Sequence, residues 1–173
     1  IPIVCMFTGS PILWASEPLT ITEEVQLKLG DAFLEQGEYY RATTEFKKLL
    51  ILFPDSPRAH YAAFAIGLCY FKGEQYDKAQ EVFNAFRISY PNSELVQRAM
   101  YLEGLSLLKR RLYPSSHLLL TVFIEKLPDS EYAPHAFITL SLIAFEQEDI
   151  FNSVLYLRNF LDRYPSDKNC EEV

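Results

Sequence analysis

Apolar residues recur every three to four positions between Thr22 and Pro165, which is the spacing of amphipathic helices. This region has neither the alternation of a β-strand nor a run of β-branched residues. At a fixed interval of 37 residues the pattern is interrupted by markers that begin with proline: Pro54-Asp55-Ser56-Pro57, Pro91-Asn92-Ser93-Glu94, Pro128-Asp129-Ser130-Glu131 and Pro165-Ser166-Asp167. A fixed period of roughly 20–50 residues indicates a repeat array. We therefore expect a fold made of repeated helical units.

Each marker predicts the end of one helix and the start of the next, because proline has no N–H with which to continue a helix. Ser56, Ser93 and Ser130 are expected to be the N-caps of the new helices, and Pro57 suits the first helical position. Two helical segments of about 14–18 residues lie between successive markers. A break between them is predicted at four places: Gln36-Gly37, Lys72-Gly73, Lys109-Arg110 and Gln147-Glu148.

Small residues recur at fixed places within these units: Gly30, Gly67, Gly104 and Ser141 in the first segments, and Ala42, Ala79, Ser116 and Ser153 in the second. Glycine inside a helix costs about 1 kcal/mol relative to alanine, so its recurrence indicates that the two helices of a unit approach closely. Bulky residues are expected to fill the space beside this contact at Phe46, Phe83, Leu120 and Leu157, and at Leu49, Phe86, Phe123 and Phe160. The units are therefore helix hairpins that bury their apolar faces by stacking.

Composition narrows the classes of partner. The 49% apolar content is typical of a globular protein, and the net charge of −7 disfavours binding to nucleic acid or to anionic membranes. The three cysteines, Cys5, Cys69 and Cys170, are odd in number and widely spaced, so they indicate neither a disulfide framework nor a zinc motif.

Residues 1–16 carry no charged side chain, and Glu17 is the first. A membrane-spanning helix needs about 20 apolar residues, and this segment contains Pro2 and Pro11. We interpret it as the apolar part of a secretory signal with a small-residue cleavage region at Ala15-Ser16. The alternative is an N-terminal arm that packs on the repeats. Residues 166–173 are expected to be a tail or the start of a capping helix.

Gly67-Leu68-Cys69-Tyr70, followed by Tyr76, Ala79, Phe83 and Pro91, resembles the tetratricopeptide repeat. A second copy consists of Gly30, Phe33, Tyr39, Ala42, Phe46 and Pro54. The resemblance covers about residues 22–165 and implies an all-α fold, a right-handed superhelix of about four stacked hairpins, with the repeat domain spanning 17–165. The usual period is about 34 residues, and the additional residues here lengthen the turn after the proline.

That longer turn is similar to the one in bacterial envelope versions of the repeat, namely the outer-membrane protein assembly factor BamD and the periplasmic coordinator YbgF/CpoB. The run from Arg98 to Leu105 resembles the BamD family. This implies a scaffold without cofactor or enzymatic activity that binds proteins in the periplasm or at the inner face of the outer membrane. Membrane association would come through other assembly subunits or an N-terminal anchor. The alternatives are a coordinator of envelope constriction and a cytoplasmic adaptor or chaperone, and the oligomeric state stays open.

In this family the first helix of each hairpin lines the concave side, which is expected to hold an apolar peptide or an amphipathic helix of a protein partner. Phe64, Phe71, Tyr101 and Phe145 are the expected anchors. The alternative is that these side chains pack as ordinary core, or that residues 1–16 fill the groove. The predicted groove residues are Glu24, Leu27, Asp31 and Leu34, then Tyr61, Phe64, Leu68 and Phe71, then Arg98, Tyr101, Leu105 and Leu108, and finally His135, Ile138, Leu142 and Phe145.

Catalytic motifs do not occur in the sequence, and the three histidines fall in different units without ligand-like spacing, so no metal site is expected. The alternative from a different class is a hydrolase or transferase site across the groove, which would rest on His135 and Glu146. The basic run Lys109-Arg110-Arg111 is interpreted as solvating a hairpin turn, with an acidic partner or a phospholipid headgroup as the alternatives.

Overall fold

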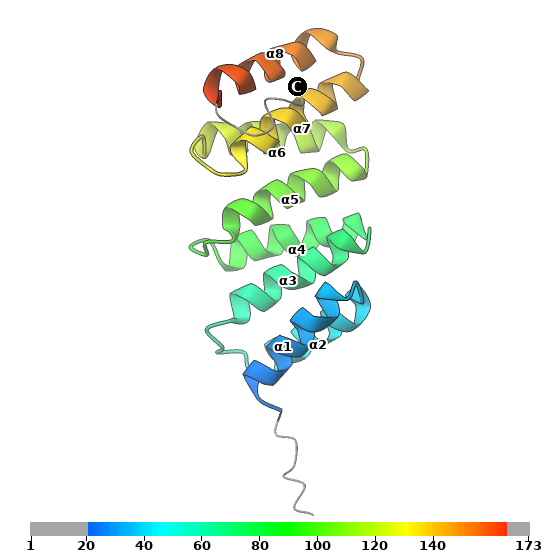
Figure 1. Cartoon of the computed structure of the whole chain (residues 1–173), viewed down its shortest axis with the longest axis vertical. Helices are drawn as coiled ribbons and strands as arrows, with labels where there is room; N and C mark the ends of the chain where they lie inside the picture. Colours follow the sequence, from blue (N-terminus) through cyan, green and yellow to red (C-terminus); the bar gives the residue numbers. More distant parts are fainter. Residues whose placement is uncertain (1–20, 166–173) are drawn as a thin grey trace, which may run out of the picture.

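The computed structural model describes residues 21–165, and the predicted N-terminal segment (1–16) and the tail (166–173) lie outside them. Within the described range the chain forms helices and no strand. They are α1 (Glu23–Glu35), α2 (Tyr39–Leu52), α3 (Ala59–Lys72), α4 (Tyr76–Ser89), α5 (Val96–Lys109), α6 (Tyr113–Lys126), α7 (Ala133–Glu146) and α8 (Ile150–Arg163). Each helix packs on the next one in the chain, and α5 also touches α3 and α7. The result is an elongated stack (Figure 1), which confirms the predicted all-α superhelix of hairpins.

The period of the sequence is also a period of the backbone. Every described helix after α1 has 14 residues, and each hairpin turn contains one residue with positive φ. These residues are Gly37 (77°), Glu74 (59°), Arg111 (58°) and Glu148 (60°), which are spaced 37 apart. The helices end at Glu35, Lys72, Lys109 and Glu146, so the four predicted breaks are confirmed.

The markers act differently from the prediction. The N-cap positions of α3, α5 and α7 are Arg58, Leu95 and Tyr132, two residues after each serine, and Pro57 lies before the first helical residue, Ala59. The predicted serine N-caps and the helical Pro57 were therefore wrong. The reason is an extra turn closed by the Ala59 N–H and the Ser56 carbonyl at 3.0 Å. Inside it the Ser56 Oγ accepts from the Arg58 N–H at 2.9 Å, so the serine shapes the connection rather than the helix.

The small-residue positions behave as predicted. A Cβ placed on Gly30, Gly67 or Gly104 would lie 2.6 Å from Phe46, Phe83 or Leu120, side chains that are fully buried in the same hairpin. Only glycine leaves room for these side chains, which explains why the helices bear its cost. In the fourth hairpin a polar contact takes the place of this packing, since the hydroxyls of Ser141 and Ser153 lie 3.0 Å apart.

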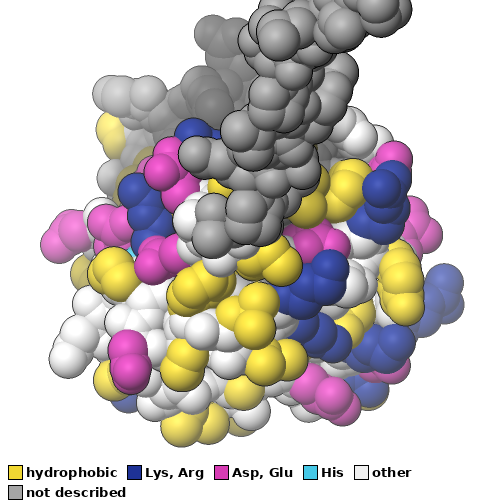
Figure 2. All heavy atoms as spheres, turned by 90° about the horizontal axis from the view of Figure 1, so that it is seen from below, with side chains coloured by type: hydrophobic (Ala, Val, Ile, Leu, Met, Phe, Trp, Pro, Cys, Tyr) yellow, Lys and Arg dark blue, Asp and Glu magenta, His cyan; other side chains and the backbone are white. Residues whose placement is uncertain are grey.

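The core runs along the stack, from a cluster around Phe46 and Leu49, through one around Phe83 and Phe86, to one around Phe123 and Phe160. At the α1–α2 end, hydrophobic side chains gather on the surface beside a group of Lys and Arg (Figure 2). Val25 and Leu29 of α1 are 44% and 40% exposed. Val25 stands 37 residues before Ala62, which is fully buried, so the array uses an apolar face for contacts between hairpins.

Candidate functional site: the inner face

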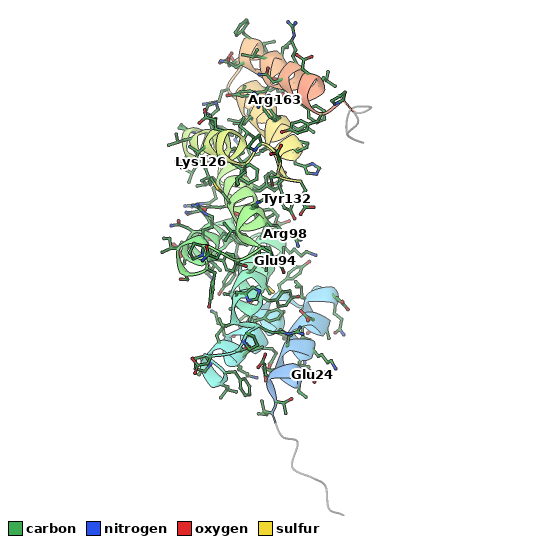
Figure 3. The ribbon with its side chains drawn as sticks, turned by 90° about the vertical axis from the view of Figure 1, so that its left-hand side faces the viewer. Glu24, Glu94, Arg98, Lys126, Tyr132 and Arg163 are labelled. Atoms are coloured by element: carbon green, nitrogen blue, oxygen red, sulfur yellow. The ribbon has the colours of Figure 1, made fainter. Side chains whose placement is uncertain are left out.

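The inner face is the side of the array formed by α1, α3, α5 and α7, the first helices of the hairpins. Figure 3 shows Glu24 of α1, Arg98 of α5 and Tyr132, which precedes α7, along this side, with Lys126 of α6 on the opposite side. All the predicted groove residues belong to these four helices. Because each helix presents the same four positions, the face consists of four columns with a spacing of 37 residues.

On α1 and α3, the second column of the inner face is buried. Leu27 is 6% exposed and Phe64 is 2% exposed. The ring of Phe64 packs against Phe83 and Phe86, with centroid distances of 5.6 and 5.8 Å, and the guanidinium of Arg98 lies 5.3 Å from its centroid. The prediction that Phe64 is an anchor for a ligand was therefore wrong: the space between α3 and α4 is wide enough to take the whole ring into the core.

A polar contact ties α1 to α3 on the same face. The Tyr61 hydroxyl donates to Asp31 Oδ1 at 2.7 Å. Burial, together with this carboxylate, raises the pKa of Tyr61 to about 12, so the hydroxyl keeps its proton at neutral pH. Leu34 is half-buried beside them. These side chains hold two hairpins in register, which favours a structural role for this part of the predicted groove.

An aromatic cluster of Tyr101, Tyr132 and His135 joins α5 to α7. The ring of Tyr101 stacks on Tyr132 with centroids 5.7 Å apart and lies 6.2 Å from His135. Its hydroxyl is 3.5 Å from Thr139 Oγ1, and burial raises its pKa. The helical pattern does not predict a role for Tyr132, because this residue precedes the first residue of α7. Tyr101 and His135 thus form a half-buried wall rather than free anchors.

Among the predicted apolar groove residues, the most exposed are on α7. Leu142 and Phe145 on α7 are 47% and 57% exposed. The residues at the same positions on α5 and α3 are half-buried, and Phe71 packs on Tyr76 with a centroid distance of 5.5 Å. Ile138 is half-buried on the same side. We call the following six residues the apolar band: Leu68, Phe71, Leu105, Leu108, Leu142 and Phe145.

The residues suggested for an enzymatic site are not brought together. His135 lies against Tyr101, whereas Glu146 Oε2 accepts a long hydrogen bond of 3.4 Å from the Tyr113 hydroxyl. They are eleven positions apart on α7, which separates them by about 16 Å. Cys69 is buried, and this burial raises its thiol pKa to about 11. Among residues 21–165, no group of three or more His, Cys, Asp or Glu could hold a metal ion.

Comparison with known proteins identifies the family. The profile of the YfiO family, described as an outer membrane lipoprotein, matches residues 22–143. No curated protein matches the sequence at a significant level. No helix in the described part of the chain is both long and apolar enough to cross a membrane.

Solved structures share the architecture at low sequence identity. MamA (41-end) from Desulfovibrio magneticus RS-1 is 22% identical with a TM-score of 0.70, covering 85% of this chain and 78% of that one. MamA from MSR-1 is 15% identical with a TM-score of 0.66, covering 83% and 77%. The apo form of RapI is 13% identical with a TM-score of 0.73, and the match spans 84% of this chain but 43% of RapI. The chain therefore belongs to the YfiO outer-membrane lipoprotein family and is a protein-interaction scaffold of the tetratricopeptide-repeat type.

Proposed function

We propose that this protein is a non-enzymatic scaffold of the bacterial envelope that takes part in the assembly of outer-membrane β-barrel proteins. In this proposal the apolar band of α3, α5 and α7 holds an apolar segment of a client or of another assembly subunit. Membership of the YfiO family supports the envelope location. The observation that carries the binding site is the exposure of Leu142 and Phe145 beside half-buried leucines of α5.

The chemistry of the band fits such a ligand. Leu105, Leu108, Leu142 and Phe145 offer apolar contact, and Arg98, Tyr101 and His135 lie nearer the N-terminal ends of the same two helices, α5 and α7. A strand of an outer-membrane barrel alternates apolar and polar side chains over about ten residues. Its apolar side chains would contact the band, and its polar side chains, which point to the other side of the strand, would face solvent. Truncating a central anchor of such an interface typically costs at least about 2 kcal/mol.

The test uses a fluorescein-labelled ten-residue peptide of alternating apolar and polar residues, and a scrambled peptide without the alternation. Fluorescence anisotropy would measure the Kd for the wild type, Leu142→Asp, Phe145→Asp and the control Ile88→Asp. Ile88 is 74% exposed on α4, outside the inner face. We expect at least a tenfold weaker Kd for the two α7 variants, with unchanged helicity, and the wild-type Kd for the control.

If all four proteins bind the peptide with equal affinity, the apolar band is not its binding site. The location is tested separately by fractionating cells that produce the full protein, where we expect it in the envelope fraction. Recovery of the protein in the cytosol would instead favour a cytoplasmic adaptor or chaperone. If depletion of the protein impairs envelope constriction but leaves the level of β-barrel proteins unchanged, it would favour the coordinator of envelope constriction.

A further inference from the structure

A second cleft lies on the outer face of the array, which is formed by α2, α4, α6 and α8. It opens between α4 and α6 and has a volume of about 750 Å³. Its floor is α5, through the buried Met100 and Leu107, and its wall is α6, where Leu118 is 67% exposed. This volume lies within the roughly 300–1,000 Å³ that is common for ligand sites. The cleft can therefore take side chains of a partner, though not a folded domain.

The preceding repeat shows why this cleft is open. The corresponding cleft between α2 and α4 has a smaller volume of about 380 Å³, and Tyr70 of α3 forms part of its lining. Lys47 donates to the Tyr70 hydroxyl at 3.0 Å, and the Nζ atoms of Lys47 and Lys78 each lie 5.5 Å from the centre of its ring. The residue 37 positions after Tyr70 is Leu107. Because leucine lacks the ring and the hydroxyl, the space filled by Tyr70 in one repeat is left open in the next.

Charges around the open cleft select for an acidic ligand. Arg87, Arg110 and Lys126 line it, and Glu103 is the only carboxylate among the lining residues. Arg87 Nε donates to Glu103 Oε2 at 2.8 Å, and Arg110 donates to Gln80 at 3.1 Å. A guanidinium has five N–H donors, and these contacts engage one donor of each. A cationic cleft in a chain of net charge −7 favours an anionic partner through the local field.

We propose that the cleft between α4 and α6 is a docking site for an acidic peptide segment of a partner protein. An aromatic or leucine side chain of this segment enters the space above Leu107 and takes the place that Tyr70 fills in the preceding repeat. A carboxylate on one side of it pairs with Arg110, whose guanidinium can form two parallel hydrogen bonds with it. A carboxylate on the other side pairs with the ammonium group of Lys126. Lys109 and Arg111 adjoin Arg110 in the sequence and add to the positive charge of this turn. The site is on the side of the array opposite to the inner face and does not depend on the function proposed above.

The test measures binding of a fluorescein-labelled nine-residue peptide that has a central phenylalanine between glutamates. The matched peptide has glutamine in place of every glutamate. We expect the acidic peptide to bind at least tenfold more tightly than its neutral form. Charge reversal at two exposed positions, Arg110→Glu with Lys126→Glu, and filling of the cleft by Leu107→Tyr should each weaken binding at least tenfold. Circular dichroism checks that each variant stays helical.

Two variants serve as controls that should keep wild-type affinity. Lys47→Glu changes the charge beside the smaller cleft, and Val154→Asp adds a charge on α8, where Val154 is 59% exposed. Equal binding of the neutral peptide, full affinity in Leu107→Tyr, or absence of binding at 1 mM peptide would each overturn the proposal. The proposal would also be overturned if vesicles of anionic phospholipid bound the wild type but not Arg110→Glu with Lys126→Glu. The basic residues of the cleft would then form a lipid headgroup site.

Discussion

The helices α3 and α7 present the same four columns to the inner face but differ in which side chains they expose. On α3, Phe64 is 2% exposed, whereas on α7 Phe145 is 57% exposed. Both are phenylalanines on a first helix and both were predicted as anchors. Phe64 has the rings of Phe83 and Phe86 of α4 around it. Phe145 belongs to another column, in which Phe71 of α3 is half-buried against Tyr76 while Phe145 itself is mostly exposed. Exposure is therefore decided by the partner helix rather than by the hydrophobicity of the residue itself.

The largest expected effect compares these two rings directly. Phe64→Ala should lower the free energy of unfolding by about 3–5 kcal/mol, because it leaves a cavity among packed rings. Phe145→Ala should change it by less than about 0.5 kcal/mol, as at other surface positions. Urea denaturation followed by circular dichroism measures both. Similar losses of stability for the two variants would show that the two rings are equally well packed.

A second experiment asks whether Gly67 and the Phe83 ring that faces it constrain each other in the hairpin formed by α3 and α4. Gly67→Ala places a Cβ against the buried Phe83 ring, and overpacking of this kind costs about 1–3 kcal/mol, offset by about 1 kcal/mol of helix propensity. Phe83→Leu makes room, so the double variant should lose less stability than the sum of the single ones. Strict additivity would show that the ring and the glycine do not constrain each other.

The contacts between hairpins offer a third comparison, which depends on pH. At the position of Ile66 in the second repeat, the third repeat has Glu103, and burial raises the pKa of this carboxyl above its ordinary value of 4.5 despite the nearby Arg87. The folded state then binds the proton more tightly than the unfolded state. The stability that Glu103 contributes is complete below the unfolded pKa and declines as the pH rises through the folded pKa. Unfolding curves from pH 4 to pH 8 should show this decline in the wild type and not in Glu103→Gln. A wild-type stability that rises with pH relative to that of Glu103→Gln would contradict the sign.

The smallest effect concerns the hairpin turns. Gly37 has a φ of 77° in the first turn, and Glu148 has a φ of 60° in the last. Gly37→Ala should lose about 1 kcal/mol, since a left-handed backbone disfavours a side chain. Glu148→Gly removes this strain but adds freedom to the unfolded chain, so we expect a change between zero and about 1 kcal/mol of stabilisation. Differential scanning calorimetry resolves both changes. A loss of stability in Glu148→Gly would show that its side chain contributes more than its backbone costs.

Much of the fold could be predicted because it depends on local chemistry that repeats. The 37-residue interval, the breaks near Gly37 and Gly73, and the pairing of Gly67 with Phe83 all follow from residue types at fixed spacing. The serine N-caps were predicted wrongly because serine is common both at helix N-caps and in turns, and its side chain accepts a backbone hydrogen bond in either place. Only the backbone path from Pro54 to Ala59 distinguishes the two roles.

The sequence by itself determined that the chain is a stack of helix hairpins, because glycine, proline and bulky apolar residues act through contacts within one repeat. Tertiary structure decided which inner-face residues are free. Whether Phe64 or Phe145 reaches solvent depends on side chains from another helix. It also decided where the outer face is open, since the cleft bordered by Leu107 has a volume of about 750 Å³, whereas the one bordered by Tyr70 one repeat earlier has about 380 Å³. The burial of a side chain depends on the helix packed against it, and the residue pattern along one helix does not specify which side chains the neighbouring helix brings into contact.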